Sequence, residues 1–137
     1  MADRYPLIGI EQGVILVAGR LFGPGGKMKN VILLLDTGAS RTTIRAAVLA
    51  QVEIDLSQPR ERRRVETMGG PVTEGIVDVP RLRVFGQERE RLEVVFTARP
   101  FPYRVDGVLG VNFLLPYRLP TFRTHEIPYP GPLESRL

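Results

Sequence analysis

The sequence VILLLDTGAS, residues 31–40, contains the two features on which the expected fold depends. The run from Asn30 to Leu35 is aliphatic after its first residue, which is typical of a β-strand buried on both faces. Asp36 follows this strand directly, and Gly38 lets backbone N–H groups approach its carboxylate. A carboxylate at the end of a buried strand is suited to general acid–base catalysis. The same residues are also compatible with a turn in which Asp36 only caps local amides.

The composition around this stretch favours short strands joined by turns. A chain of 137 residues with 43% hydrophobic residues fits one globular domain with one core. Its 14 glycines and 12 prolines exceed average usage, and long helical patterns are missing. We therefore expect a mainly β fold in a single domain spanning residues 1–137. Five prolines from Pro116 onward indicate a proline-rich C-terminal extension from about residue 116.

Hydrophobic periodicity and turn residues predict the order of the elements. Two strands, 5–10 and 14–22, precede the aliphatic strand, and a short helix is expected through residues 44–50, capped by Thr42 or Thr43. Residues 57–64 are expected to form a surface connection. The remaining predictions are a hairpin of 65–68 and 72–79, a hairpin of 81–85 and 92–97, and one or two helical turns over 111–115.

The residue counts exclude several kinds of site. With no cysteine, the chain has no disulfide, thiolate metal ligand or cysteine nucleophile. His125 is the only histidine, so a zinc site built from several histidines is excluded, and no metal or organic cofactor is expected. The longest aliphatic run, residues 31–35, is too short to span a bilayer, and no leader is apparent. We expect a soluble, cytoplasmic protein that does not interact with membranes.

The charge pattern gives little support to a nucleic-acid-binding function. Lys and Arg number 19 against 15 Asp and Glu, a net charge of +4. The one dense basic run, Arg60 to Arg64, has no interleaved aromatic residues that could stack on bases, so we expect a solvated loop there and no nucleic acid partner. Asp55, Asp78 and the glutamates are expected to be solvated charges. The stretch Gly23 to Lys27 lacks the ending of a phosphate-binding loop.

Three motifs, in this order, resemble those of the retroviral-type aspartic proteases, the retropepsins. The first is the Asp36-Thr37-Gly38-Ala39 loop after its apolar strand. The second is Met68-Gly69-Gly70-Pro71, which is similar to the glycine-rich flap of that family, and the third is the DGVLG stretch of residues 106–110 followed by VNFL. The resemblance covers residues 14–115 and implies a closed acid-protease β-barrel with one or two short helices.

The resemblance implies a role for each matching residue. Asp36 would be the catalytic carboxylate, Thr37 would hydrogen-bond across a dimer, and Gly38 would offer its amide to the carboxylate and its backbone to substrate. The residues implied to bind substrate are Ala39, Ser40, Met68, Gly69, Gly70 and Val108.

The chain departs from the retroviral pattern at two places. Ser40-Arg41 and Val111-Asn112 stand where acidic residues and an Arg-Asn pair are frequent, so an acid–arginine bridge is lost. Asn112 is retained and is expected to bond near Thr42. A viral cleavage preference therefore does not carry over.

Only one Asp-Thr-Gly sequence occurs in the chain, yet an aspartic protease needs two carboxylates close enough to share a proton. Asp106-Gly107 is not a second copy because it lacks the intervening hydroxyl residue. The second carboxylate must come from another copy of the chain, as a symmetric homodimer supplies.

The function expected first is therefore an aspartic endopeptidase in which two Asp36 carboxylates activate a water against a peptide or protein substrate. A second hypothesis is that the chain has the same fold but is a catalytically inactive, dimeric peptide-binding module. A third treats Leu35 to Gly38 as the phosphate-contacting turn of an actin-like kinase, but that fold requires a much longer chain.

Overall fold

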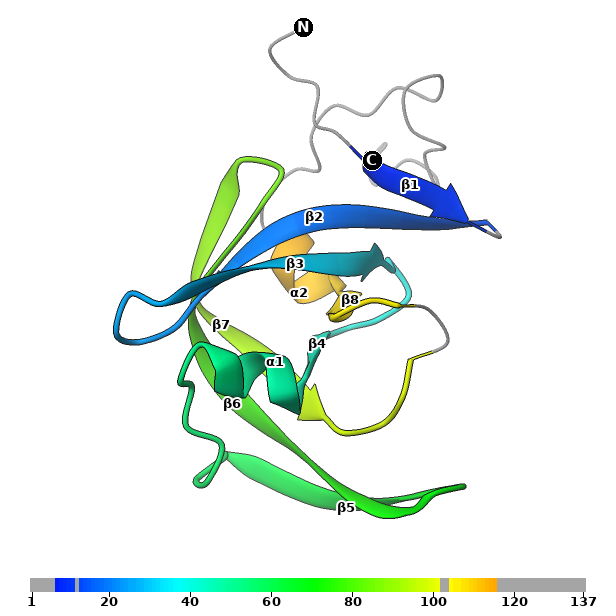
Figure 1. Cartoon of the computed structure of the whole chain (residues 1–137), viewed down its shortest axis with the longest axis vertical. Coiled ribbons are helices and arrows are strands. Elements are labelled where there is room, and N and C mark those ends of the chain that lie inside the picture. The colour runs from blue at the N-terminus through cyan, green and yellow to red at the C-terminus, as the bar shows by residue number, and fades with distance from the viewer. Residues whose placement is uncertain (1–6, 12, 102–103, 116–137) are drawn as a thin grey trace, which may run out of the picture.

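The computed structural model describes residues 7–11, 13–101 and 104–115, so the predicted proline-rich extension and His125 lie outside the described residues. Within these ranges the chain is mainly β with two short helices, as predicted (Figure 1). The elements are β1 (Leu7–Glu11), β2 (Val14–Phe22), β3 (Met28–Leu35), β4 (Thr42–Arg45), α1 (Ala46–Gln51), β5 (Glu61–Thr67), β6 (Gly70–Val84), β7 (Gln87–Thr97), β8 (Gly107–Leu109) and α2 (Val111–Leu114). Neither helix is long and apolar enough to cross a membrane.

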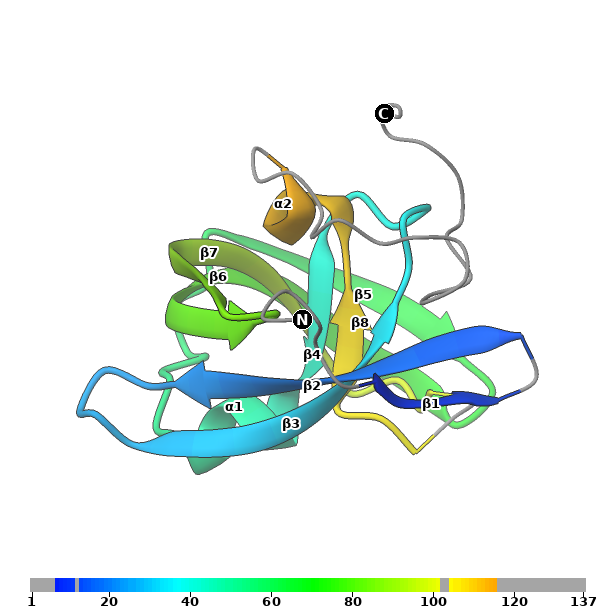
Figure 2. The same ribbon diagram turned by 90° about the horizontal axis from the view of Figure 1, so that it is seen from above.

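The eight strands form one sheet in the order β1-β2-β3-β8-β4-β7-β6-β5. The strand β2 pairs with β6 as well as with β3, so hydrogen-bonded pairings lead from β2 through β3, β8, β4, β7 and β6 back to β2. Most neighbours are antiparallel, but β8 runs parallel to β3, and β4 runs parallel to β7. Figure 2 shows the short strands β4 and β8 side by side in the centre of the molecule.

The core lies on the inner face of this sheet, and β3 illustrates how it is built. Val31 and Leu33 are fully buried, whereas Ile32, Leu34 and Leu35 are half-buried. The prediction that this strand is buried on both faces is therefore wrong for the single chain, because only one of its faces packs against the core. Inner-face side chains from β2, β4, β6, β7, β8 and the two helices complete the cluster, among them Val17, Leu21, Ile44, Leu49, Leu82, Val94, Leu109 and Phe113.

The helix predicted over residues 44–50 starts later than expected. Residues 42–45 form β4, which pairs with both β7 and β8, and α1 begins at Ala46. Neither Thr42 nor Thr43 caps this helix, because its N-cap residue is Arg45, which makes no side-chain capping bond. Strand pairing on both edges outweighs the weak helical preference of this short segment.

The segment after α1 also differs from the prediction. Residues 61–64, expected in a surface connection, belong to β5, and the two predicted hairpins share one 15-residue strand, β6. The basic residues Arg62 to Arg64 thus lie on a strand at the edge of the sheet and not in a loop, although they are exposed as expected.

Glu74 on β6 is not the solvated charge that was predicted, because its side chain is only 3% exposed. Arg99 donates from Nε to Oε2 (2.5 Å) and from Nη2 to Oε1 (3.0 Å). Thr97 donates its hydroxyl to Oε2 (2.6 Å), and Arg63 on β5 donates to Oε1 (3.2 Å). The hydrogen bonds from Arg99, and then those from Thr97 and Arg63, lower the pKa of Glu74 to about 2 against the opposing effect of burial.

This pKa shift predicts a defined acid sensitivity of the fold. The folded-state pKa of Glu74 lies below its ordinary value of 4.5, so its carboxylate stabilises the protein fully above about pH 4.5. That stabilisation, on the order of 3 kcal/mol, should be lost as the pH falls towards 2. Urea unfolding across this range should show a flatter acid dependence for Glu74→Gln than for the wild type. Glu90→Gln, an exposed change on β7, serves as the control; equal acid dependence in all three proteins would contradict the assignment.

Candidate functional site

The Asp36 loop leaves β3 at its carboxyl end and is held by backbone bonds. The N–H of Asp36 donates to the carbonyl oxygen of Leu109 on β8 (3.1 Å), and the N–H of Ala39 donates to the carbonyl oxygen of Asp36 (3.2 Å). The N–H of Gly38 donates to the Asp36 side chain at Oδ1 (2.8 Å). Since Asp36 is half-buried and Gly38 exposed, the loop presents an oriented carboxylate at the surface of the chain.

The segment joining β8 to α2 packs directly against this loop. The N–H of Val111 donates to the carbonyl oxygen of Ala39 (2.8 Å). A Cβ at Gly110 would lie 2.5 Å from the carbonyl group of Arg41 and 2.9 Å from the carbonyl oxygen of Ala39, which is too close for any side chain. Glycine at position 110 therefore allows the two segments to approach.

Side-chain hydrogen bonds also hold the Asp36 loop against the segment that joins β8 to α2. Asn112 accepts at Oδ1 from both the backbone N–H of Thr42 (2.8 Å) and its hydroxyl (2.9 Å). The hydroxyl oxygen of Thr42 accepts from the N–H of Gly110 (3.1 Å), and Asn112 donates from Nδ2 to the carbonyl oxygen of Glu93 on β7 (2.7 Å). The predicted bond between Asn112 and the neighbourhood of Thr42 is confirmed, and it joins the Asp36 loop to both α2 and β7.

Arg41 pairs with an acid that the sequence did not single out. Its Nε lies 2.8 Å from Oε1 of Glu93, whose other oxygen lies 2.9 Å from Nη1 of Arg60. These two guanidinium groups hold the pKa of Glu93 below its ordinary value. A sequence signal for this pair is absent, because residues 41 and 93 are brought together only by the parallel pairing of β4 with β7.

Val108, a predicted substrate-binding residue, lies on β8 and not on the Asp36 loop itself. In the sheet register Thr43 is the partner of both Val108 and Val95, so these three half-buried side chains share one face. Their neighbours Ile44, Val94 and Leu109 point into the core instead. Thr43, Val95 and Val108 thus form a half-buried outer face of β8, β4 and β7.

The predicted flap residues form the free end of the β5–β6 hairpin. The hydroxyl of Thr67 donates to the carbonyl oxygen of Gly70 (2.5 Å) and accepts from the N–H of Gly69 (3.2 Å), which closes the turn, and Met68 is fully exposed. Gly70 has a φ of +108°, a conformation that L side chains rarely adopt. Both views place this end of the hairpin and the β3–β4 connection on the same side of the molecule (Figures 1 and 2).

The single chain brings together only part of the predicted site. Asp36, Thr37, Gly38, Ala39 and Ser40 lie on one loop, but among the described residues no hydrogen bond or ion pair joins this loop to the hairpin tip. Thr37 is half-buried and makes no side-chain hydrogen bond within those ranges. The described part of the chain also holds no group of three or more His, Asp or Glu residues able to bind a metal ion.

Comparisons with known proteins agree with this geometry. The family model described as aspartyl protease matches residues 17–113, which include the Asp36 loop, the β5–β6 hairpin and most of α2. The structure is similar to the crystal structure of a retropepsin-like aspartic protease from Rickettsia conorii, with a TM-score of 0.58 and 18% sequence identity. That match covers 86% of this chain and 90% of the other, and it confirms the retropepsin-like fold. The comparison with curated proteins found no match.

The Thr42–Asn112 network yields a prediction about the stability of the site. Thr42→Val removes a hydroxyl that both donates and accepts inside the structure, so it should lower the free energy of unfolding by about 1–3 kcal/mol. Thr43→Val makes the same chemical change at the neighbouring half-buried position, which has no side-chain hydrogen bond in the described ranges, and should cost much less. Urea unfolding of both variants tests this difference. Equal losses would show that the network does not fix the loop.

Proposed function

The chain belongs to the aspartyl protease family, and from this premise we propose that it is an aspartic endopeptidase whose active site forms between two copies. The family and the fold support a peptidase. The observation that carries the proposal is the Asp36 carboxylate, which is held at Oδ1 by the N–H of Gly38 and yet stays accessible at the end of β3. A carboxylate oriented in this way is available to take and return protons.

The proposed homodimer follows from the need for two carboxylates. One chain supplies a single Asp-Thr-Gly loop, and a two-fold axis beside that loop would bring a second Asp36 next to the first. Thr37, half-buried and without a side-chain bond in the described ranges, would then donate across the axis. We also propose that the ring of pairings closed by β2 and β6 is the closed barrel of this fold.

In the proposed reaction, two adjacent carboxylates share one proton because both cannot readily ionise together. The ionised Asp36 takes a proton from a water whose oxygen attacks the carbonyl carbon of the scissile bond. The protonated Asp36 donates its proton to the carbonyl oxygen. Collapse of the tetrahedral intermediate breaks the C–N bond, and a proton passes to the departing amine, so no covalent enzyme intermediate forms.

The substrate in this proposal lies extended over the outer face shared by Thr43, Val95 and Val108. Backbone groups of Gly38 and of the flap around Met68, Gly69 and Gly70 would pair with the peptide in the manner of an added strand. Ala39 and Ser40 would border the groove beside Asp36. The tip is exposed and closed by a single threonine hydroxyl, which is compatible with movement over a bound peptide.

The alternative is a catalytically inactive, dimeric peptide-binding module of the same fold. It would use the same groove and flap, and it differs only in the absence of turnover. The intact Asp-Thr-Gly-Ala sequence and the oriented carboxylate favour the enzyme. The cytoplasmic location remains a prediction from the sequence.

Replacing the proposed catalytic group should abolish turnover. Asp36→Asn keeps the size of the side chain and an acceptor for Gly38, but it removes the titrating group, so peptide hydrolysis should fall by about 10²–10⁴-fold. Cleavage of a diverse peptide mixture, followed by mass spectrometry, measures the loss. Asp55→Asn, at an exposed turn, is the matched control and should retain activity. Near-normal turnover in a folded Asp36→Asn protein would refute the assignment.

A site shared between two chains makes activity depend on concentration. Specific activity should fall when the protein is diluted below the dissociation constant of the dimer, and Thr37→Ala should shift this fall to higher concentrations. Sedimentation velocity measured over the same concentrations relates activity to the dimer. A fully active monomer would overturn the shared site.

A further inference from the structure

We propose that the substrate groove contains a pocket that recognises an acidic side chain of the peptide through Arg41, Arg62 and Arg63. This inference deepens the proposed peptidase function and rests on it, because it names the class of substrate: peptides with Asp or Glu at one position near the scissile bond. The arginines come from two elements, the Asp36 loop and the β5 strand of the flap.

The pocket lies between the base of the flap and the outer face of the sheet. It has a volume of about 100 Å³, well below that of a typical small-molecule site, so it suits one side chain and not a whole ligand. Its lining residues are Arg41, Glu61, Arg62, Arg63, Glu74, Gly75, Ile76 and Val95.

The position of Val95 connects this pocket to the proposed groove. Val95 shares its outer face with Thr43 and Val108, the face on which the peptide is proposed to lie. Arg41 belongs to the loop that carries Asp36, five residues further along the chain. A side chain of a peptide crossing this face therefore has the pocket within reach.

Two carboxylates that bind arginines of the pocket, Glu74 in its lining and Glu93 outside the lining, already have protein donors on both oxygens. Oε1 of Glu74 accepts from Arg63 and Arg99, and its Oε2 accepts from Thr97 and Arg99. Glu93, the partner of Arg41, uses one oxygen for Arg41 and the other for Arg60. These carboxylates have little capacity left to bind a further cation.

The arginines, in contrast, keep unused donors. Within the described ranges Arg41 bonds only through Nε, Arg62 only through Nη2 to the carbonyl oxygen of Ser57, and Arg63 through Nε and Nη2. The Arg63 side chain is 70% exposed and that of Arg41 47% exposed. The remaining N–H groups belong to residues that line a small cavity, and carboxylates are among the ligands that guanidinium groups bind most strongly.

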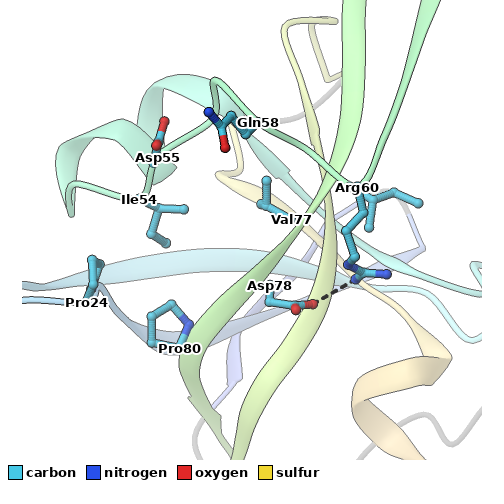
Figure 3. Close-up of a pocket in the computed structure, with 9 residues that line it drawn as sticks. Pro24, Ile54, Asp55, Gln58, Arg60, Val77, Asp78 and Pro80 are labelled. Atoms are coloured by element: carbon cyan, nitrogen blue, oxygen red, sulfur yellow. Dashed lines mark hydrogen bonds and ion pairs between the residues drawn. The ribbon is translucent and has the colours of Figure 1, made fainter.

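A second pocket, lined by Ile76 to Asp78 of β6 and by the segment after α1, provides a contrast (Figure 3). It is larger, about 310 Å³, and is lined by Asp55 and Asp78 but by only one cation, Arg60. Both terminal nitrogens of Arg60 are used, Nη2 by Asp78 and Nη1 by Glu93. An excess of arginine donors is thus a property of the pocket facing the groove and not of every hollow near the basic strand.

Glu61 is the one lining carboxylate without a hydrogen bond or ion pair in the described ranges, and it is exposed. Its negative charge opposes an acidic ligand. Removing the charge of Glu61 should therefore strengthen the binding of an acidic side chain. Removing an arginine of the pocket should weaken it.

Binding to the Asp36→Asn protein tests the pocket separately from catalysis. Fluorescent peptides that carry a single Glu, Asp or Gln, moved through each position, are titrated and followed by anisotropy. At one position Glu or Asp should bind about five- to tenfold more tightly than Gln. Arg63→Gln and Arg62→Gln should each reduce this preference, and Glu61→Gln should increase it. Arg64→Gln removes the same charge from β5 outside the pocket and should leave the preference intact.

The outcomes separate the two proposals. A preference for Glu that Arg62→Gln and Arg63→Gln reduce supports the pocket even if the wild-type protein cleaves none of the peptides, a result that would overturn only the peptidase. Equal binding of Glu and Gln peptides, an equal effect of Arg64→Gln, or no peptide binding at all would overturn the pocket. Melting temperatures of all variants show that each is folded.

Discussion

The arrangement of the site depends on the close contact between the Asp36 loop and the segment that joins β8 to α2. Gly110 permits this contact, and Thr42 and Asn112 fill it with a closed set of hydrogen bonds. Because the bonds are buried or partly buried, any displacement of the loop would leave polar groups unpaired at a cost of about 1–3 kcal/mol each. The carboxylate of Asp36, which the N–H of Gly38 contacts directly, is therefore held in place by a loop that Gly110, Thr42 and Asn112 fix from behind.

A second set of contacts, around Glu74, holds the β5–β6 hairpin away from its tip. Glu74 on β6 is buried and is bound by Arg63 from β5 and by Thr97 and Arg99 from the end of β7. The tip around Met68 makes no comparable contact in the described part of the chain. A hairpin fixed away from its tip, with few contacts at the tip itself, would suit the proposed flap, which has to bend over a groove without leaving the sheet.

Sequence patterns predict the parts of the site that form within a few neighbouring residues. They do not predict the parts that depend on the pairing of strands far apart in the chain. The Asp36 loop, the Gly69–Gly70 turn and the short helix at Val111 were predictable, because apolar runs and glycines act within a few residues. The helix predicted from Ile44 was wrong in its first turn, since β4 is stabilised by neighbours far along the chain. The sequence predicts solvated charges at Glu74 and Glu93, because nothing in their own segments shows the arginines that bind them.

The basic run, which the sequence predicts as a solvated loop, lies largely on β5 at the edge of the sheet. Its charge therefore affects which strands can pair with that edge. An exposed edge strand offers unpaired backbone groups to any other strand, and charged side chains oppose such pairing. Arg62, Arg63 and Arg64 on β5 would repel the same strand of a second copy. In the proposed dimer the two chains would therefore meet through the Asp36 loops and not edge to edge through β5, which leaves the flap and its arginines free to contact a substrate.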